Sequence, residues 1–373
     1  MIENKVERPL ILVPGILESS LAIIKDPEFY DIWPLKPWVP NYDILVKLLF
    51  DLGNNIRTKV DEDIPVVPTG LLPGFFDSLI GAILKWGYKL ESNFWVFPYD
   101  WRQSNEISGQ MLAEFIKKKN LDSVDIICHS MGGFVARAAS NFLSQSKEDA
   151  RINRTAYIDT PHLGNPLSYF ELNPKIPNVG FADFYEKTAM TDEIRSIIYG
   201  HPDFDKKMNE LYRKWPSAYE LMPDDNYLKN RPMIYSDGQP VYGADKTYLE
   251  NEWGLHHQDM QRKVKNAMKF KENLGDLNGN HDDTLVIYCN TLKTLDTIGY
   301  SSTGITIDKK TFNFFPPFDN DQRGDSIVVR YSAKGSMSDK LTYEHKSVRD
   351  VIHTALPNNA ETIQEIQKFL NPQ

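Results

Sequence analysis

Residues 124–140, VDIICHSMGGFVARAAS, pass from an apolar run straight into an amphipathic stretch. The apolar run, residues 123–128, predicts a strand that is buried inside a parallel sheet. The stretch from Gly132 onward predicts a helix, because its apolar residues recur at helical spacing. A buried strand that turns at once into a helix indicates an α/β fold, and it places Ser130 in the turn.

The same alternation occurs in the first and last parts of the chain. Short apolar runs predict strands over residues 8–15, 94–102, 154–160, 284–290 and 325–333. Amphipathic stretches predict helices over residues 105–120, 132–143 and 359–370. Strands that alternate with helices form βαβ crossovers, so we expect a largely parallel sheet with helices on both faces.

The segment between Pro161 and Asp283 breaks this alternation. It contains helix-like runs and no clear strand of a parallel sheet. We therefore expect one α/β core, made of residues 1–160 and 284–373, which is interrupted by a helical cap or lid over residues 161–283.

The net charge of the chain bears on which kinds of molecule it can bind. The chain carries a formal net charge of −9, whereas binding to nucleic acid needs a basic surface. Nucleic acid is therefore not expected as a partner. Strong adhesion to anionic lipid is disfavoured, although a local basic patch would still allow transient contact with a membrane surface. The oligomeric state stays open.

The cysteines and the N-terminus bear on the compartment. The two cysteines, Cys128 and Cys289, are too few for a cysteine-rich zinc site or a disulfide framework. The N-terminus shows no apolar region of a secretory signal. The most apolar stretch, residues 71–88, is too short and too polar to span a membrane. We expect a cytoplasmic protein.

Ser130 has the surroundings of a nucleophile. A serine hydroxyl is a poor nucleophile unless a base takes its proton and a sharp turn exposes it. The usual pattern is Gly-x-Ser-x-Gly, and this chain has Cys128 in place of the first glycine. Cysteine is a small side chain, so the exchange is conservative. The competing interpretation is that Ser130 only caps the following helix.

The order of acidic and histidine residues supports the first interpretation. In hydrolases of this type the triad follows the order Ser, Asp or Glu, His along the chain. Asp325 follows a glycine in a turn after a late predicted strand, and His353 lies just before the last predicted helix. The alternatives for the acid are Asp319 and Asp321, and the alternative for the base is His345. His129 adjoins the serine on the opposite face of its strand and is expected to pack behind the turn.

Several motifs together resemble the lecithin:cholesterol acyltransferase-like family of lipases and acyltransferases. They are LILVPGILESSLA (10–22), FPYDWR (97–102), CHSMGG (128–133) and GDSIV (324–328). IDTPHLGNP (158–166) and PSAYELMP (216–223) are further stretches similar to bacterial relatives. The resemblance spans residues 10 to about 353. It implies an α/β-hydrolase fold in which the helical insertion covers the acyl site.

The resemblance also implies roles for single residues. Ser130 would be the nucleophile, Asp325 the acid and His353 the base. The oxyanion hole would be formed by the backbone N–H groups of Leu17 and Met131, with Ile16 as the alternative to Leu17. The implied activity is hydrolysis of lipid acyl esters, or transfer of the acyl group to an alcohol, through an acyl-enzyme. A soluble carboxylesterase or peptidase, and a non-catalytic binding protein, are the alternatives.

The substrate site is expected to be apolar. Trp33 and Trp38 lie among prolines in DIWPLKPWVP, which predicts a loop, and together with Ile16 they are candidates for the pocket. A metal is not expected. The acidic stretch DLNGNHDD (276–283) has His281 where a calcium loop needs glycine, and Ile287 where it needs glutamate. No cofactor is expected, and a lipid or another acyl ester is the expected ligand.

Overall fold

The computed structural model describes residues 8–25, 28–33, 66–146, 150–175, 209–210, 212–250, 254–277, 283–301, 304–306, 323–336 and 343–371. A six-stranded sheet with the order β15-β10-β7-β6-β1-β5 lies at its centre, and each of its pairings is parallel. Its strands are β1 (Leu10–Val13), β5 (Phe94–Val96), β6 (Ser123–His129), β7 (Arg151–Ile158), β10 (Asp283–Cys289) and β15 (Glu344–Val348). The inner strands are apolar runs because both of their faces are buried.

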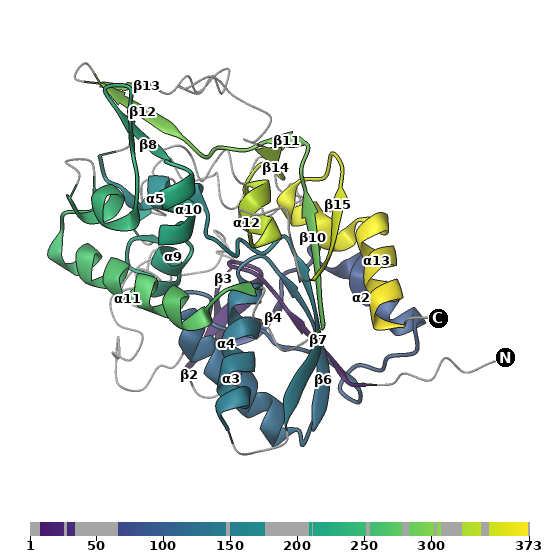
Figure 1. The fold of residues 1–373 in the computed structure, drawn as a ribbon. Helices are drawn as coiled ribbons and strands as arrows, with labels where there is room; N and C mark the ends of the chain where they lie inside the picture. Colours follow the sequence, from purple (N-terminus) through teal and green to yellow (C-terminus); the bar gives the residue numbers. More distant parts are fainter. Residues whose placement is uncertain are drawn as a thin grey trace.

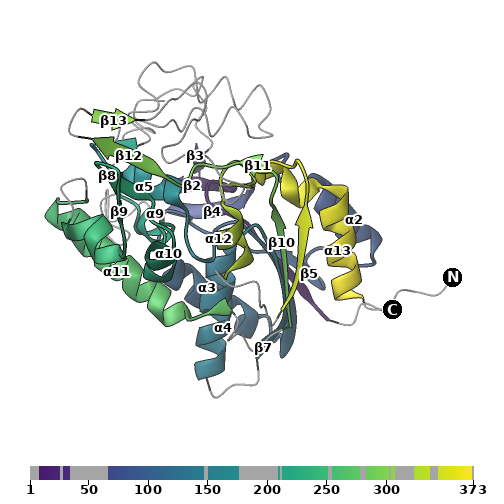
Figure 2. The same ribbon diagram turned by 45° about the horizontal axis from the view of Figure 1, so that its top comes forward.

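Helices cover both faces of this sheet (Figures 1 and 2). On one face lie α3 (Asn105–Lys118), α4 (Gly132–Gln145) and α12 (Arg330–Lys334). On the other face lie α2 (Asp77–Lys85) and α13 (Ala360–Leu370). This arrangement confirms the predicted α/β-hydrolase fold, with a mostly parallel sheet between two helical layers.

The strand order reverses beside β1, and this point positions the site. The chain passes from β1 outward to β5 and then crosses back to β6 on the other side of β1. Loops that leave the carboxyl ends of β1 and β6 therefore diverge and open a crevice between them. The turn after β1 and the turn that carries Ser130 both lie at this crevice.

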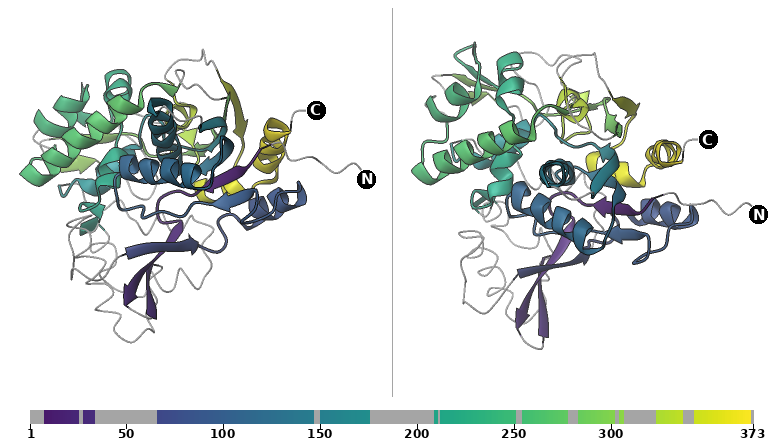
Figure 3. Two further views of the ribbon diagram at one scale, coloured as in Figure 1. Left: turned by 90° about the horizontal axis from the view of Figure 1, so that it is seen from below. Right: turned by 60° about the horizontal axis from the view of Figure 1, so that its bottom comes forward.

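Within the described residues, three smaller sheets accompany the main one. A three-stranded antiparallel sheet, β3-β2-β4, extends away from the helical layers (Figure 3). Its strands are β2 (Ser19–Lys25), β3 (Glu28–Trp33) and β4 (Val66–Leu71). A four-stranded sheet has the order β13-β12-β8-β9, and it consists of β8 (Ile234–Ser236), β9 (Gln239–Val241), β12 (Ile298–Ser301) and β13 (Gly304–Thr306). The third sheet pairs β11 (Leu292–Lys293) with β14 (Arg323–Gly324).

The segment predicted to be a cap is largely helical where it is described. It holds α5 (Pro166–Leu172), α9 (Pro216–Glu220), α10 (Asp225–Asn230), a π-helical turn (Lys246–Glu250) and α11 (Gln258–Leu274). Strand β8 in this segment pairs in parallel with β12, which lies after it in the chain. The division into core and cap at residues 161–283 stays a prediction. In the described part of the chain, no helix has the length and apolar character that crossing a membrane requires.

The last strand of the sheet differs from the prediction. Residues 325–333 were expected to form a strand, but they form a turn that leads into α12. The reason lies in Asp325, whose carboxylate accepts the backbone N–H groups of Ile327 and Val328 and so competes with strand pairing. The sheet instead ends in β15, a charged and mostly exposed strand, and charge on an edge strand protects it from pairing with other chains.

Candidate active site

Ser130 lies in a sharp turn between β6 and α4. Its backbone has φ of 52°, in the left-handed region that side chains other than glycine rarely adopt. Its N–H donates to the carbonyl oxygen of Ile158 at 2.9 Å, and no side chain caps the start of α4. A Cβ on Gly132 would lie 2.4 Å from the carbonyl oxygen of Pro14, so only glycine fits there. The turn therefore presents the serine side chain instead of using it as a helix cap.

The structure brings Ser130, His353 and Asp325 together in one hydrogen-bonded chain. His353 Nε2 lies 2.8 Å from Ser130 Oγ. On the other side of the ring, His353 Nδ1 hydrogen-bonds Asp325 Oδ2. All three side chains are buried, and they come from positions up to 223 residues apart. This is the geometry in which an imidazole can take a proton from a hydroxyl while a carboxylate orients it.

Two turns hold the acid and the base in register. Asp325 Oδ1 accepts from the N–H groups of Ile327 at 2.9 Å and Val328 at 2.7 Å, which leaves Oδ2 for the imidazole. The N–H of His353 donates to the carbonyl oxygen of Asp325 at 3.1 Å. His353 begins a short 3₁₀ helix, His353–Asn358, that leads into α13. Hydrogen bonds of both the side chains and the backbone thus hold Asp325 and His353 in fixed positions relative to each other.

Burial and charge act in opposite directions on this pair. Burial alone would raise the pKa of Asp325, but the charge and hydrogen bond of His353, with further hydrogen bonds from Asp159 and Val328, bring that pKa below its ordinary value. Burial alone would lower the pKa of His353, but the charge and hydrogen bond of Asp325 and the charge of Glu18 raise it above 6.5. Asp325 is therefore a carboxylate that favours the protonated imidazole.

A second carboxyl group, Asp159, lies behind the first. It follows β7 directly, and its Oδ2 accepts from the N–H of Cys289 at 3.3 Å. Its side chain lies beside that of Asp325, with oxygen atoms of the two carboxyl groups within 4.8 Å of each other. Burial, together with the charge and hydrogen bond of Asp325, raises the pKa of Asp159 well above its ordinary value. A hydrogen bond between two carboxyl groups needs a proton, and the opposite directions of the two pKa shifts favour Asp159 as the group that holds it.

Sequence reasoning did not single out Asp159, although one signal was present. It is an acidic residue that directly follows a buried strand, at the edge of the sheet where Ser130 also lies. Glu18 was missed too. Its carboxylate lies 2.6 Å from Nδ1 of His129, a contact between residues 111 positions apart in the chain.

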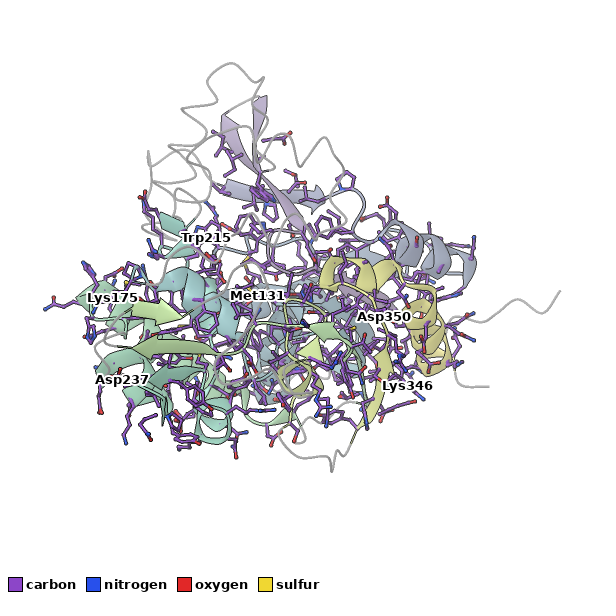
Figure 4. The ribbon with its side chains drawn as sticks, turned by 90° about the horizontal axis from the view of Figure 1, so that it is seen from above. Met131, Lys175, Trp215, Asp237, Lys346 and Asp350 are labelled. Atoms are coloured by element: carbon purple, nitrogen blue, oxygen red, sulfur yellow. The ribbon has the colours of Figure 1, made fainter. Side chains whose placement is uncertain are left out.

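The turn after β1 faces the serine from the other side of the crevice. Leu17 has φ of 64°, and a Cβ on Gly15 would lie 2.8 Å from the Cβ of Ser130. Within the described part of the chain, neither the N–H of Leu17 nor that of Met131 donates a hydrogen bond. In Figure 4, which views the molecule from above, Met131 lies near the middle of the molecule. Both N–H groups thus remain available for a ligand oxygen.

An apolar cleft leads to Ser130 and His353. It encloses about 840 Å³ of empty space, open solvent at its mouth included. Its apolar lining includes Ile16, Leu17, Trp33, Leu72, Phe75, Leu167, Leu221, Ile327 and Val328. Trp33 ends strand β3 instead of lying in a loop, is fully buried, and donates its indole N–H to the carbonyl oxygen of Leu17 at 2.9 Å.

The other predicted candidates lie elsewhere. Trp38, Asp319 and Asp321 fall outside the described residues. His345 lies on the edge strand β15, where it is exposed and its ring stacks on that of Tyr288.

The cluster of acids around the base could also be considered as a cation site. Ligand atoms of Asp159, Asp325 and His353 all lie within 4.8 Å of one another. Both ring nitrogens of His353 are already hydrogen-bonded, one to Asp325 and one to Ser130. The donors are thus engaged with each other, which favours proton transfer as the use of this cluster.

Sequence comparisons found known proteins that are similar to part of this chain. The family model of lecithin:cholesterol acyltransferase matches residues 68–174. Lecithin-cholesterol acyltransferase-like 4 from Arabidopsis thaliana is 23% identical over 244 residues, which are 57% of this chain and 42% of that protein. The uncharacterized protein YJR098C from Saccharomyces cerevisiae is 27% identical over 218 residues, which are 53% of this chain and 30% of that protein. The chain thus spans less than half the length of these curated relatives.

Solved structures are similar at a lower level. The propeptide form of the lipase BlEst2 from Bacillus licheniformis is 11% identical, with a TM-score of 0.41, and the match covers 99% of this chain and 51% of that one. Naproxen esterase from Bacillus subtilis is 10% identical, with a TM-score of 0.34, over 98% of this chain and 85% of that one. The match over residues 68–174, which contains Ser130, and the two curated relatives thus make this chain similar to lecithin:cholesterol acyltransferase and its relatives.

Proposed function

We propose that this chain is a serine-dependent acyl-ester hydrolase or O-acyltransferase that acts on lipid esters. One observation carries the proposal. The hydrogen-bonded chain from Ser130 through His353 to Asp325 lies at an apolar cleft, at the point where the strand order of the sheet reverses. The similarity to lecithin:cholesterol acyltransferase points to the same chemistry.

The first half of the reaction forms an acyl-enzyme. His353 Nε2 takes the proton of Ser130 as Oγ attacks the ester carbonyl carbon, and Asp325 stabilises the imidazolium that results. The carbonyl oxygen gains a negative charge in the tetrahedral intermediate, and the N–H groups of Leu17 and Met131 are the donors proposed to bind it. The intermediate then expels the alcohol, which takes the proton from His353.

The second half of the reaction releases the acyl group. Water or an acceptor alcohol gives its proton to His353 and attacks the acyl carbonyl, and Ser130 regains its proton when the new ester or acid leaves. The apolar lining of the cleft fits an acyl chain, because transferring such a chain from water to an apolar wall stabilises the complex. Hydrolysis and transfer differ only in which hydroxyl reaches the acyl-enzyme.

The nucleophile is tested with a fluorophosphonate probe and with p-nitrophenyl esters of two chain lengths. We expect labelling at Ser130, faster turnover of the decanoyl than of the acetyl ester, and loss of both labelling and turnover in Ser130→Ala. Ser144→Ala is the matched control, since Ser144 is an exposed serine of α4 that bonds only the backbone of its own helix. Turnover that survives in Ser130→Ala contradicts the proposal.

The same assay separates the alternatives. A strong preference for the acetyl ester would favour a short-chain carboxylesterase on this fold. A phospholipid supplied together with a long-chain alcohol then distinguishes the two reaction outcomes, because transfer yields a new ester whereas hydrolysis yields a free fatty acid. Product analysis by mass spectrometry measures the ratio of the two.

A further inference from the structure

We propose that Glu18 and His129 act as a positioning pair, which locks the turn after β1 and the backbone that carries His353 onto the turn of Ser130. The inference rests on the proposed function, because positioning matters only if Ser130 and His353 perform the chemistry. It assigns a role to two buried ionisable side chains that the reaction itself does not use.

Glu18 fastens the turn after β1. One of its carboxylate oxygens lies 2.6 Å from His129 Nδ1, and the other accepts the backbone N–H of Gly15. The carboxylate therefore closes the turn of residues 15–18 on itself and ties it to the last residue of β6. Its side chain is only 4% exposed, so water does not compete for these bonds.

His129 extends the connection to the base. Its Nε2 lies 3.2 Å from the carbonyl oxygen of His353, and the two rings are 4.7 Å apart between centroids. Phe76 packs edge to face with His129. One imidazole thus links the turn after β1, the end of β6 and the first residue of the 3₁₀ helix.

The proton count of the pair follows from its partners. Both ring nitrogens of His129 face oxygen atoms, and a carbonyl oxygen can only accept a hydrogen bond. His129 Nε2 must therefore carry a proton, and a second proton must lie between Nδ1 and Glu18. This shared proton joins the two side chains and leaves the pair without net charge inside the protein.

Such a connection is needed because the turns it joins are strained. Leu17 and Ser130 both have positive φ, at 64° and 52°. Residues in this region keep their conformation only where the surroundings hold them. Without Glu18, Leu17 can relax, and its N–H then turns away from the position of the intermediate's oxygen.

The test compares two variants at Glu18 with one variant of a control ion pair. Asp125 and Arg154 form a buried ion pair on the same sheet, near the start of β6 and away from the cleft, at 2.6 Å. We expect Glu18→Ala to lower kcat roughly 100-fold, the cost of misplacing reacting groups, with KM within about 3-fold of wild type. Asp125→Asn should lower Tm and leave kcat within about 3-fold.

A conservative variant distinguishes positioning from charge. In Glu18→Gln the amide oxygen can still accept from Gly15, and the amide N–H can donate to a neutral His129, so the chain of bonds persists without charge. We expect Glu18→Gln to keep kcat within about 5-fold of wild type. If it loses as much activity as Glu18→Ala, the positioning proposal is overturned. A Glu18→Ala variant that loses stability but keeps kcat overturns it as well.

Two further measurements make the result unambiguous. Binding of an alkyl boronic acid, which forms a tetrahedral adduct with an active serine, should weaken in Glu18→Ala as much as kcat falls. If Glu18→Ala does not fold, the double variant Glu18→Gln with His129→Phe removes the two contacts of His129, with residue 18 and with the carbonyl oxygen of His353, without leaving a buried charge, and it should lower kcat as well. Full turnover in Ser130→Ala would instead contradict the proposed function, so the two failures remain distinguishable.

Discussion

Two neighbouring carboxyl groups should respond in opposite ways to the same substitution. Asp325 and Asp159 lie side by side next to the base, and their pKa values shift in opposite directions, that of Asp325 lowered and that of Asp159 raised. Replacing each in turn by asparagine keeps the shape and removes the charge. We expect Asp325→Asn to abolish nearly all turnover and Asp159→Asn to leave it close to wild type.

The size of the first effect follows from the hydrogen bonds of Asp325. Its Oδ1 accepts from Ile327 and Val328, so the oxygen of the new amide must stay there. The amide nitrogen then faces His353 Nδ1 and donates to it, which leaves the proton of the neutral ring on Nε2. A ring protonated at Nε2 cannot accept the proton of Ser130. The wrong tautomer costs on the order of 10⁴-fold in kcat, or about 5 kcal/mol of transition-state stabilisation.

The second effect is small because asparagine imitates a protonated aspartic acid. In Asp159→Asn the amide oxygen can accept from Cys289, and the amide N–H can donate to Asp325. We expect kcat within about 3-fold of wild type, whereas Asp159→Ala should lose roughly 10-fold because Asp325 loses that hydrogen bond.

The assay is steady-state hydrolysis of p-nitrophenyl decanoate, with circular dichroism to verify that each variant is folded. Equal losses in Asp159→Asn and Asp325→Asn would refute the assignment of the proton to Asp159. The reverse order, with Asp159→Asn inactive and Asp325→Asn active, would make Asp159 the acid of the triad.

Three more predictions follow from single features. The acidic limb of the kcat/KM profile should lie above pH 6.5, because Asp325 and Glu18 raise the pKa of His353 against the effect of burial and the base works only when neutral; a limb below 6.5 would contradict this. Gly132→Ala should cost about 1–3 kcal/mol in the free energy of unfolding and also lower kcat, since its Cβ would meet two backbone oxygens at 2.4 and 2.6 Å; unchanged denaturant midpoints would show that the turn yields. Burial raises the pKa of Glu220 from 4.5 to about 7, so its stabilising contribution is complete below pH 4.5, is lost as pH rises through 7, and leaves a cost of about 3 kcal/mol at pH 8. Glu220→Gln should therefore raise Tm relative to wild type at pH 8 and not at pH 4, and an equal difference at both would contradict this.

The inner strands and the main helices could be predicted from sequence because their patterns are local. Apolar runs marked β1, β6, β7 and β10, and helical spacing marked α3, α4 and α13. Strand β15 could not be found in this way, because Glu344–Val348 is charged and forms a strand only where β10 offers it an unpaired edge. The helix α12 was missed because apolar residues 327–329 lie in a turn that Asp325 imposes.

The residues of the site also fall into those that the sequence could predict and those that it could not. The order of serine, aspartate and histidine along the chain predicted which three residues meet, and the structure has them hydrogen-bonded, while their catalytic roles stay a prediction. Glu18 and Asp159 carry no pattern of their own. Their importance arises from neighbours more than one hundred positions away, which only the folded chain reveals.

Trp33 connects two properties that an enzyme engineer would prefer to vary separately. Its ring forms part of the cleft wall, and its indole N–H holds the carbonyl oxygen of Leu17. A smaller side chain at this position would widen the cleft for a bulkier acyl group, and at the same time release the residue proposed to stabilise the reaction intermediate. New substrate ranges in this scaffold are therefore reached more safely by substitutions at Leu167 or Leu221. Both residues line the same cleft but belong to a later part of the chain than Trp33 and Leu17.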